Sequence, residues 1–269
     1  MKTKLFVKLF AGEFGFELMR WQGCIRHIAK DYDHVTVECK EGHEYLYEDF
    51  AHRIIRYRII EAKKVSCSLF VGKSKPIDPI EKQNDFDRIV KPCIEICDMQ
   101  MDQHFIPLGK IGSHQGYDLV IHARNDKRVV KYGDRNWPLS NWEKVSNHFA
   151  NKRIASIGSK ESAFYVPGTH DLRGIPLKSL SNVVCNSKLC VGPSSGPMHL
   201  TSLCKCKHIV WTIQGKKFMK AGVRRAAETS RTRYESSWNP LKTPAIVIDE
   251  YGWCPKPNVV IEEIKKCLA

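Results

Sequence analysis

Short apolar stretches and amphipathic stretches follow one another along this chain in the order strand, turn, helix, strand. Residues 4–10 alternate between apolar and polar positions and are rich in Leu, Phe and Val, which predicts a strand. Residues 16–30 carry apolar side chains at helical spacing, and HVTVEC at 34–39 predicts a second strand. Because a doubly wound parallel sheet begins in this way, the pattern predicts an α/β fold.

A second series of strands and helices begins at Tyr117. Strands are predicted at 118–122, 153–157, 188–191, 207–213 and 245–248, and helices at 140–150, 177–186 and 258–268. Ser140 has Glu143 at the spacing of a capping box, so it is predicted to cap the first of these helices. Trp137 and Trp142 are predicted to pack in the core or at the entry to this helix.

The two series predict two Rossmann-like domains. Residues 107–116 have the glycine and proline content of a linker. We therefore expect a reduced N-terminal domain over 1–112, a C-terminal domain over 117–250 and a C-terminal helix within 251–269. In open α/β sheets ligands bind at the carboxyl ends of the strands, so polar residues directly after strands are the first candidates for a site.

The residues after the predicted strand 188–191 are typical of an anion-binding turn. Small residues lead to Pro197, which suits a first helical turn. Free backbone N–H groups and the helix dipole favour a phosphate at such a strand–turn–helix, and Ser194, Ser195 and His199 could add side-chain contacts. An ordinary strand-to-helix turn has the same composition, so both interpretations stay open from the turn alone.

The net charge and the cysteine content of the chain indicate which kinds of ligand or binding partner it can have. The 269 residues carry a formal net charge of +14, which attracts polyanions such as nucleic acid, an anionic lipid surface, a phosphorylated glycan or a nucleotide. No apolar run reaches the roughly 18 residues that a membrane span requires. Eleven cysteines, an odd number without zinc-like spacing, predict reduced thiols in a cytoplasmic protein and no metal site.

Three motifs in order resemble the heptosyltransferase-like glycosyltransferases of glycosyltransferase family 9, which are GT-B enzymes. They are RNWPLSNW at 135–142, DLRG at 171–174 and the turn within 191–200. The resemblance is good over 117–212 and weaker over 4–39. It implies two Rossmann-like domains facing across a cleft, with the nucleotide-sugar donor on the C-terminal domain and the acceptor approaching from the N-terminal one. It also implies inversion at the anomeric carbon without a metal or other cofactor.

The resemblance implies roles for single residues of the donor site. Arg135 matches the position of a lysine that holds the donor diphosphate in the family. Ser195, Gly196 and His199 match the phosphate-binding turn. Family members usually carry aspartate where this chain has Ser194, so the donor sugar stays open, and the nucleotide is expected to be UDP or ADP.

Glycosyl transfer needs a base for the acceptor hydroxyl and positive charge for the leaving diphosphate. Glu13 and Glu17 both lie near the turn after the first predicted strand. We favour Glu13 as the base, because the glycines on either side of it permit close approach of a ligand. There are two alternatives. In one, Glu17 is the base and Glu13 orients it; in the other, both are solvated glutamates at a helix start.

Arg20, on the following helix, is a candidate contact for an anionic acceptor. His122 and Arg124, at the end of strand 118–122, are candidates for the donor diphosphate or for a structural role.

The acceptor is open between two classes. The segment 216–238 carries seven basic residues beside Tyr234 and Trp238, as a nucleic-acid surface does, with Arg224 and Arg225 as candidate contacts. The first hypothesis is therefore a DNA-modifying enzyme that adds sugar to hydroxymethylated bases of double-stranded DNA, as some bacteriophage enzymes do. The second is transfer to a phosphorylated cell-surface glycan or lipopolysaccharide-like acceptor. An inactive GT-B-like binding module is a third, against which the intact turn and carboxylates argue. The oligomeric state is not predicted.

Overall fold

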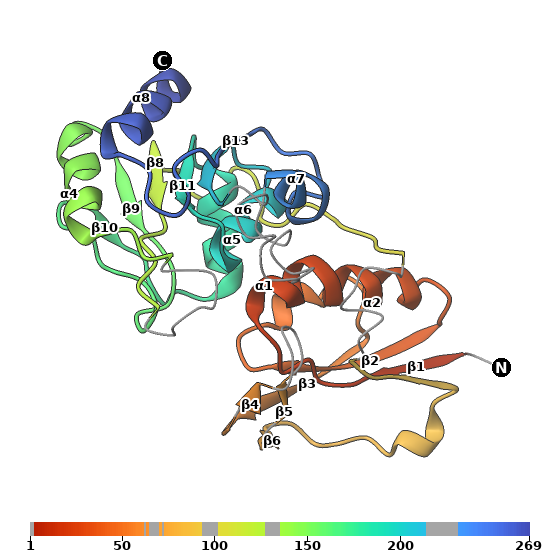
Figure 1. The fold of residues 1–269 in the computed structure, drawn as a ribbon. Helices are drawn as coiled ribbons and strands as arrows, with labels where there is room; N and C mark the ends of the chain where they lie inside the picture. Colours follow the sequence, from red (N-terminus) through yellow and green to blue (C-terminus); the bar gives the residue numbers. More distant parts are fainter. Residues whose placement is uncertain are drawn as a thin grey trace, which may run out of the picture. The chain divides into compact units, whose positions relative to one another are not determined.

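The computed structural model describes residues 3–61, 63–64, 70–71, 73–92, 102–126, 135–213 and 231–269. The chain divides into two compact units, Met1–Phe105 and Ile106–Ala269. Each unit contains its own largely parallel β-sheet with helices packed on it (Figure 1). The predicted α/β class with two parallel-sheet domains is therefore confirmed.

The N-terminal unit is organised around a five-stranded sheet in the order β6-β3-β2-β1-β7. These strands are β1 (Lys4–Val7), β2 (His34–Lys40), β3 (Arg53–Ile59), β6 (Ser74–Pro76) and β7 (Arg88–Val90). All neighbours in this sheet pair in parallel except β3 and β6. A separate antiparallel pair is formed by β4 (Lys63–Lys64) and β5 (Phe70–Val71). The parallel register sets the carboxyl ends of β1 and β2 side by side.

The helical segment between β1 and β2 is not one uniform helix. It consists of α1 (Phe14–Phe16), a π-helical turn η1 (Glu17–Trp21) and α2 (Gln22–Ala29). The predicted helix is thus confirmed, with an internal change of winding that hydrophobic spacing does not reveal. The short 3-10 helices η2 (Glu44–Leu46) and η3 (Gln83–Asp85) complete this unit.

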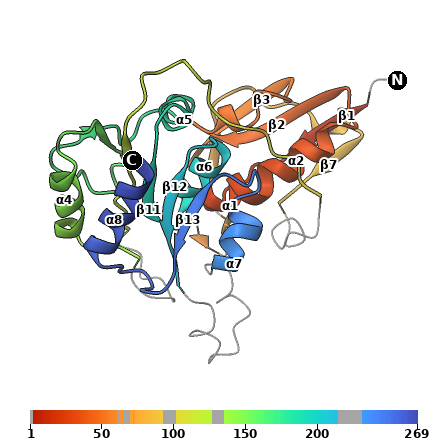
Figure 2. The same cartoon turned by 90° about the horizontal axis from the view of Figure 1, so that it is seen from above.

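The C-terminal unit contains a six-stranded parallel sheet in the order β10-β9-β8-β11-β12-β13. Its strands are β8 (Leu119–Ile121), β9 (Ile154–Ser156), β10 (His170–Asp171), β11 (Cys190–Pro193), β12 (His208–Trp211) and β13 (Ala245–Ile248). The helices are α4 (Leu139–His148), α5 (Leu177–Cys185), α6 (Gly196–Leu203), α7 (Arg231–Arg233) with the π-helical turn η6 (Tyr234–Trp238), and α8 (Pro257–Leu268). Helices α4 and α8 pack together on one face of the sheet, and α5 and α6 lie on the other (Figure 2).

A cluster of three tryptophans lies at the centre of the α4–α8 face. Trp137, Trp142 and Trp211 are fully buried, with ring centroids 4.8 to 5.4 Å apart. The predicted core role of Trp137 and Trp142 is confirmed. The capping-box prediction is wrong, because α4 begins at Leu139 with Pro138 as its N-cap residue and no side chain caps it. None of the described helices combines the length and apolar content needed to cross a membrane.

Candidate active site

The turn between β11 and α6 is short and tightly packed. Only Ser194 and Ser195 separate the end of the strand from Gly196, where the helix begins. Ser195 is the N-cap residue, but its hydroxyl donates to the Pro193 carbonyl (2.9 Å), and no side chain among the described residues caps this helix end. The predicted strand, turn and helix are confirmed. A helix start without a side-chain cap can bind an anion through its backbone N–H groups.

Glycine at position 192 permits the close packing of α6 on the sheet. A Cβ at Gly192 would lie 3.0 Å from the Met198 sulfur and 3.1 Å from both the Cβ and the carbonyl oxygen of His122. The strand end, the residue after β8 and the first turn of α6 therefore pack directly against each other.

His199 lies in the first turn of α6, and one of its ring nitrogens makes no hydrogen bond within the described part of the chain. Its backbone N–H donates to the Ser195 carbonyl (2.9 Å), and its ring stacks on Trp238 with centroids 4.6 Å apart and planes 14° from parallel. The residue is 6% exposed, and its Nδ1 has no hydrogen-bond partner among the described residues. Burial, with the nearby positive charge of Arg135, lowers the pKa of His199 to about 3. His199 is therefore a neutral, buried imidazole with a polar atom still to be satisfied, which is a feature expected of a binding site.

Arg135 acts electrostatically on His199, although 63 residues of chain separate the two. Its guanidinium lies 5.0 Å from the ring centroid of Trp253. The neighbouring residue, Asn136, exchanges two hydrogen bonds of 2.9 Å with the backbone of Asp126. Arg124 pairs with the Asp126 carboxylate at 2.8 Å. Arg124, Asp126 and Asn136 thus form a connected polar group, and Asn136 directly follows Arg135 in the chain.

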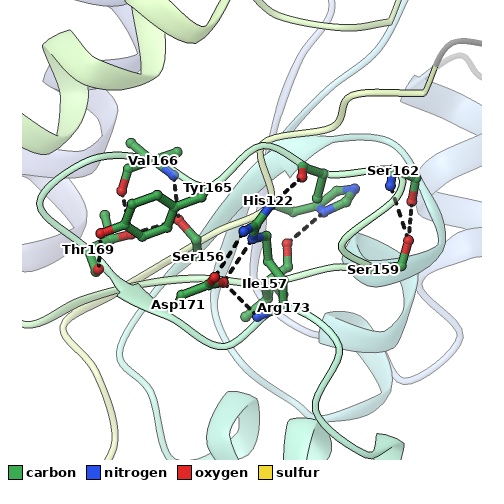
Figure 3. Close-up of polar contacts among 11 residues, drawn as sticks. His122, Ser156, Ile157, Ser159, Ser162, Tyr165, Val166, Thr169, Asp171 and Arg173 are labelled. Atoms are coloured by element: carbon green, nitrogen blue, oxygen red, sulfur yellow. Dashed lines mark hydrogen bonds and ion pairs between the residues drawn. The ribbon is translucent and has the colours of Figure 1, made fainter.

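His122 and the DLRG motif lie in a network of polar contacts that Figure 3 shows in close-up. His122 is buried, its Nδ1 lies 3.3 Å from the Ile157 carbonyl oxygen, and burial lowers its pKa to about 4. Arg173 makes a two-pronged ion pair with Asp171 (2.8 and 2.9 Å) and donates to the Ala163 carbonyl (2.9 Å). These contacts are those expected if His122 has a structural role, which is the alternative to a contact with the donor diphosphate. Its role toward a donor stays a prediction.

Two aromatic residues of the basic segment 216–238 are buried. The Tyr234 hydroxyl lies 2.6 Å from Nε2 of His208, and Trp238 stacks on His199. The prediction that they belong to a nucleic-acid surface is wrong for these two residues, because neither ring is exposed to stack on a base. Arg224 and Arg225 lie outside the described residues.

In the N-terminal unit, Glu13 and Glu17 have different surroundings. Glu13 is half-buried, and its backbone carbonyl accepts the N–H groups of Phe16 and Glu17, both at 3.0 Å. It is the extended N-cap residue of α1, with its side chain not used for capping. Arg20 is 1% exposed within η1, and its role toward an acceptor stays a prediction.

Glu17 is fully buried at the centre of a cluster of four side chains, which we call the Glu17 cluster: Glu17, Lys40, His43 and Tyr47. Its Oε2 lies 2.6 Å from Lys40 Nζ and 2.7 Å from His43 Nδ1, and its Oε1 accepts a hydrogen bond from Tyr47 OH at 2.9 Å. Burial alone would raise the pKa of Glu17, but His43 and Lys40 outweigh it and hold the pKa at about 2. A carboxylate with these partners is a weak base, so its environment favours a role in positioning other groups.

The other three members of the Glu17 cluster were not identified from the sequence. Lys40 ends β2, and His43 and Tyr47 follow it closely along the chain. Ligands bind beyond the carboxyl ends of parallel strands, so the polar residues after β2 carry the same sequence signal as those after β1. Among the described residues, no three His, Cys, Asp or Glu side chains lie together in a way that could hold a metal ion.

Comparison with known proteins identifies the fold. No known protein-family model and no curated protein matches the chain. The solved structure of E. coli ADP-heptose LPS heptosyltransferase II is similar over 99% of this chain and 98% of that chain, with 11% identity and a TM-score of 0.60. A glycosyl transferase family 9 protein of Veillonella parvula is similar over 99% and 97%, with 11% identity and a TM-score of 0.56. E. coli heptosyltransferase WaaC with ADP-2-deoxy-2-fluoro heptose is similar over 98% and 99%, with 10% identity and a TM-score of 0.52. The chain thus has the GT-B-like fold of these proteins.

Proposed function

We propose that this protein is a glycosyltransferase that moves a sugar from a nucleotide-sugar donor to an anionic acceptor. The observation that carries the proposal is His199, whose buried imidazole has an unused nitrogen in the first turn of α6, close to the charge of Arg135. The GT-B-like fold supports it, since the similar proteins are heptosyltransferases and a family 9 glycosyl transferase.

The donor diphosphate is proposed to bind at the start of α6. Backbone N–H groups there are uncapped, and the positive end of the helix dipole favours an anion. Ser194 and Ser195 are proposed to add hydroxyl contacts, that of Ser195 by turning from the Pro193 carbonyl to the phosphate. His199 is proposed to add its ring nitrogen and Arg135 a positive charge. Such preorganised positive groups stabilise charge that develops on a leaving diphosphate. Two of the similar proteins are an ADP-heptose LPS heptosyltransferase and a heptosyltransferase with ADP-2-deoxy-2-fluoro heptose, so an ADP-linked sugar is the proposed donor.

The proposed transfer inverts the anomeric carbon. The acceptor oxygen forms a bond to that carbon while the bond to the diphosphate breaks, and the electron pair leaves with the nucleoside diphosphate. A base must take the proton of the acceptor hydroxyl. Glu13, in the turn after the first strand, is predicted for this role, and that assignment stays a prediction. No metal or cofactor is proposed.

For the acceptor, the net charge of +14 supports a polyanion. Double-stranded DNA with hydroxymethylated bases and a phosphorylated surface glycan are the two proposals, and the burial of Tyr234 and Trp238 weakens the first.

Replacing Arg135 tests the donor site. Arg135→Ala is expected to weaken nucleotide binding about 10- to 150-fold, because a charged hydrogen bond contributes about 1.5–3 kcal/mol. Isothermal calorimetry with ADP, UDP and ADP-heptose measures this. Arg153→Ala is the matched control, because Arg153 also lies over an aromatic ring in the same unit, 4.9 Å from the centroid of Tyr117, but at the amino end of β9. If wild type binds none of these nucleotides, or if Arg135→Ala binds them as wild type does, the proposed site is wrong.

A further inference from the structure

The Glu17 cluster is a buried ionised group at an edge of the sheet where ligands bind in α/β folds, and the donor site does not use it. Glu17 comes from the helical segment after β1, Lys40 from the last position of β2, and His43 from the turn after β2. The parallel pairing of β1 and β2 brings these segments together at one edge. Burying a charge is costly unless it is paired and hydrogen-bonded, and three partners meet that need for Glu17.

The ionisation of Glu17 determines which nitrogen of His43 carries the proton. With a pKa of about 2, Glu17 is a carboxylate near neutral pH and can only accept hydrogen bonds. The 2.7 Å contact to His43 therefore requires an N–H at Nδ1. In the neutral ring, Nε2 then keeps its lone pair and can accept a proton.

His43 is the member of the cluster that reaches solvent. Its side chain is 23% exposed, compared with 14% for Lys40 and 1% for Glu17, and Tyr47 is fully buried. Among the described residues, no hydrogen bond engages Nε2, and this nitrogen is not buried. The Phe14 ring packs edge-on against the imidazole with centroids 5.3 Å apart, which restricts the ring orientation.

Lys40 holds the Glu17 carboxylate through a second contact, in addition to that of His43. Its ammonium group lies 2.6 Å from Glu17 Oε2 and donates to the Gly12 carbonyl at 3.0 Å. The cluster is thus tied to the loop after β1. Lys40 and His43 therefore both contact the same carboxylate oxygen of Glu17 and hold it in place.

We propose that His43 is the catalytic base of the transfer and that Glu17 is its positioning residue. The inference rests on the proposed function and assigns to His43 the step that the sequence analysis gives to Glu13. Nε2 of His43 takes the proton of the acceptor hydroxyl while the acceptor oxygen bonds to the anomeric carbon. The bond from that carbon to the diphosphate breaks, and its electron pair leaves with the nucleoside diphosphate. The imidazolium that forms is stabilised by the Glu17 carboxylate, as in other carboxylate–histidine pairs.

The kinetic test uses ADP-heptose with water as the acceptor and measures the release of ADP. His43→Ala is expected to lower kcat about 10²- to 10⁴-fold, the usual contribution of a general base, with an unchanged donor Kd. Added imidazole is expected to restore part of the rate, because it can occupy the space left by the side chain. His43→Asn is expected to lose the rate as well, while its amide keeps a donor for Glu17 and protects the fold.

The control and the competing assignment are measured in parallel. His27→Gln removes a more exposed histidine, on α2 of the same unit, and is expected to retain the wild-type rate. Wild-type kcat in His43→Ala would overturn the inference, and so would a loss that imidazole does not restore. If Glu13→Gln loses the rate of ADP release while both His43 variants retain it, Glu13 is the catalytic base.

A second measurement does not depend on turnover. Long-range ¹H–¹⁵N correlation on histidine-labelled protein is expected to show His43 as the Nδ1–H tautomer, and the Nε2–H tautomer would overturn the inference. If wild type binds no nucleotide sugar by calorimetry, the proposed function fails and the base assignment falls with it. If wild type binds ADP-heptose and releases ADP while His43→Ala does so at the same rate, only the base assignment fails.

Discussion

Glu17 and His199 are both buried, and burial moves their pKa values in opposite directions. Loss of water disfavours the charged form of each group, which raises the pKa of a carboxyl and lowers that of an imidazole. For Glu17, the charges of His43 and Lys40 outweigh this effect, so the carboxylate persists. For His199, Arg135 adds to it, so the ring is neutral. The N-terminal unit therefore contains a buried anion that can orient a base, and the C-terminal unit a neutral imidazole beside a cation, which suits a phosphate.

The lowered pKa of Glu17 predicts a dependence of stability on pH. A carboxyl with a pKa of about 2 in the folded state and about 4.3 when unfolded stabilises the fold above pH 4.3 and loses this contribution as the pH falls towards 2. The ionised Glu17 carboxylate therefore adds roughly 3 kcal/mol to the free energy of unfolding near neutral pH. Urea unfolding of wild type and Glu17→Gln is expected to show a difference that is largest at pH 7 and shrinks from pH 4.5 to pH 2.5.

Glu41→Gln is the control for this measurement, because the Glu41 side chain is 45% exposed and pairs with Arg58 at the surface. Its effect is expected to stay within about 0.5 kcal/mol, as is usual for surface substitutions. A difference between wild type and Glu17→Gln that stays constant from pH 7 to pH 2.5 would contradict the assignment of an ionised, buried Glu17.

At the scale of elements, the proposed donor site depends on how closely α6 packs on the sheet. The helix starts two residues after β11 ends, and Gly192 leaves no room for a side chain between Met198 and His122. The same packing buries His199 and stacks it on Trp238 of η6. The orientation of the uncapped helix end thus follows from a strand, a helix and a π-helical turn together.

Gly192→Ala tests this packing. The added methyl group would meet the His122 backbone and Cβ at 3.1 Å, and these atoms cannot rotate away. Overpacking of this kind costs about 1–3 kcal/mol, so we expect the Tm to fall by several degrees and nucleotide affinity to decrease with it. Differential scanning fluorimetry and calorimetry measure the two effects. Ser179→Ala, at an exposed position on α5, serves as the control. If Gly192→Ala has the same Tm as wild type, α6 can shift without a loss of stability and the packing argument is wrong.

At the scale of the whole molecule, the main property is charge. The net charge of +14 gives attraction to any polyanion, and attraction alone does not distinguish DNA from a phosphorylated glycan. The basic residues of the segment 216–238 that lie outside the described residues, including Arg224 and Arg225, carry the remaining support for DNA. Their aromatic neighbours Tyr234 and Trp238 belong to the interior.

The DNA proposal predicts a steep dependence of affinity on salt. Each neutralised phosphate contributes about 0.9 to the log–log slope, so Arg224→Ala with Arg225→Ala is expected to lower the slope by about two units and to weaken all duplex sequences alike. Fluorescence anisotropy across a salt series measures this. A wild type that binds no duplex at low salt and transfers sugar to a glycan would exclude DNA as the acceptor.

The sequence by itself determined the first two strands with the helical segment between them, most strands and helices of the C-terminal unit, the turn before α6 and the burial of Trp137 and Trp142. These features follow from local patterns: apolar periodicity, Pro197 in a first helical turn, and apolar residues at positions facing a core. The π-helical winding of η1 was not predictable in this way, because hydrophobic spacing alone does not distinguish it from an α-helix.

Only the tertiary structure decided the surroundings of the polar residues. Glu17 was interpretable from the sequence as a base or a solvated glutamate, and the pairing of β1 with β2 gave it Lys40, His43 and Tyr47 as partners. Arg135 lowers the pKa of His199 because the fold of the C-terminal unit brings these two residues, distant in the sequence, near each other. The physical reason is common to both: a side chain's charge and protonation depend on burial and on neighbours within a few ångströms, and strand pairing brings together neighbours that are distant in the sequence.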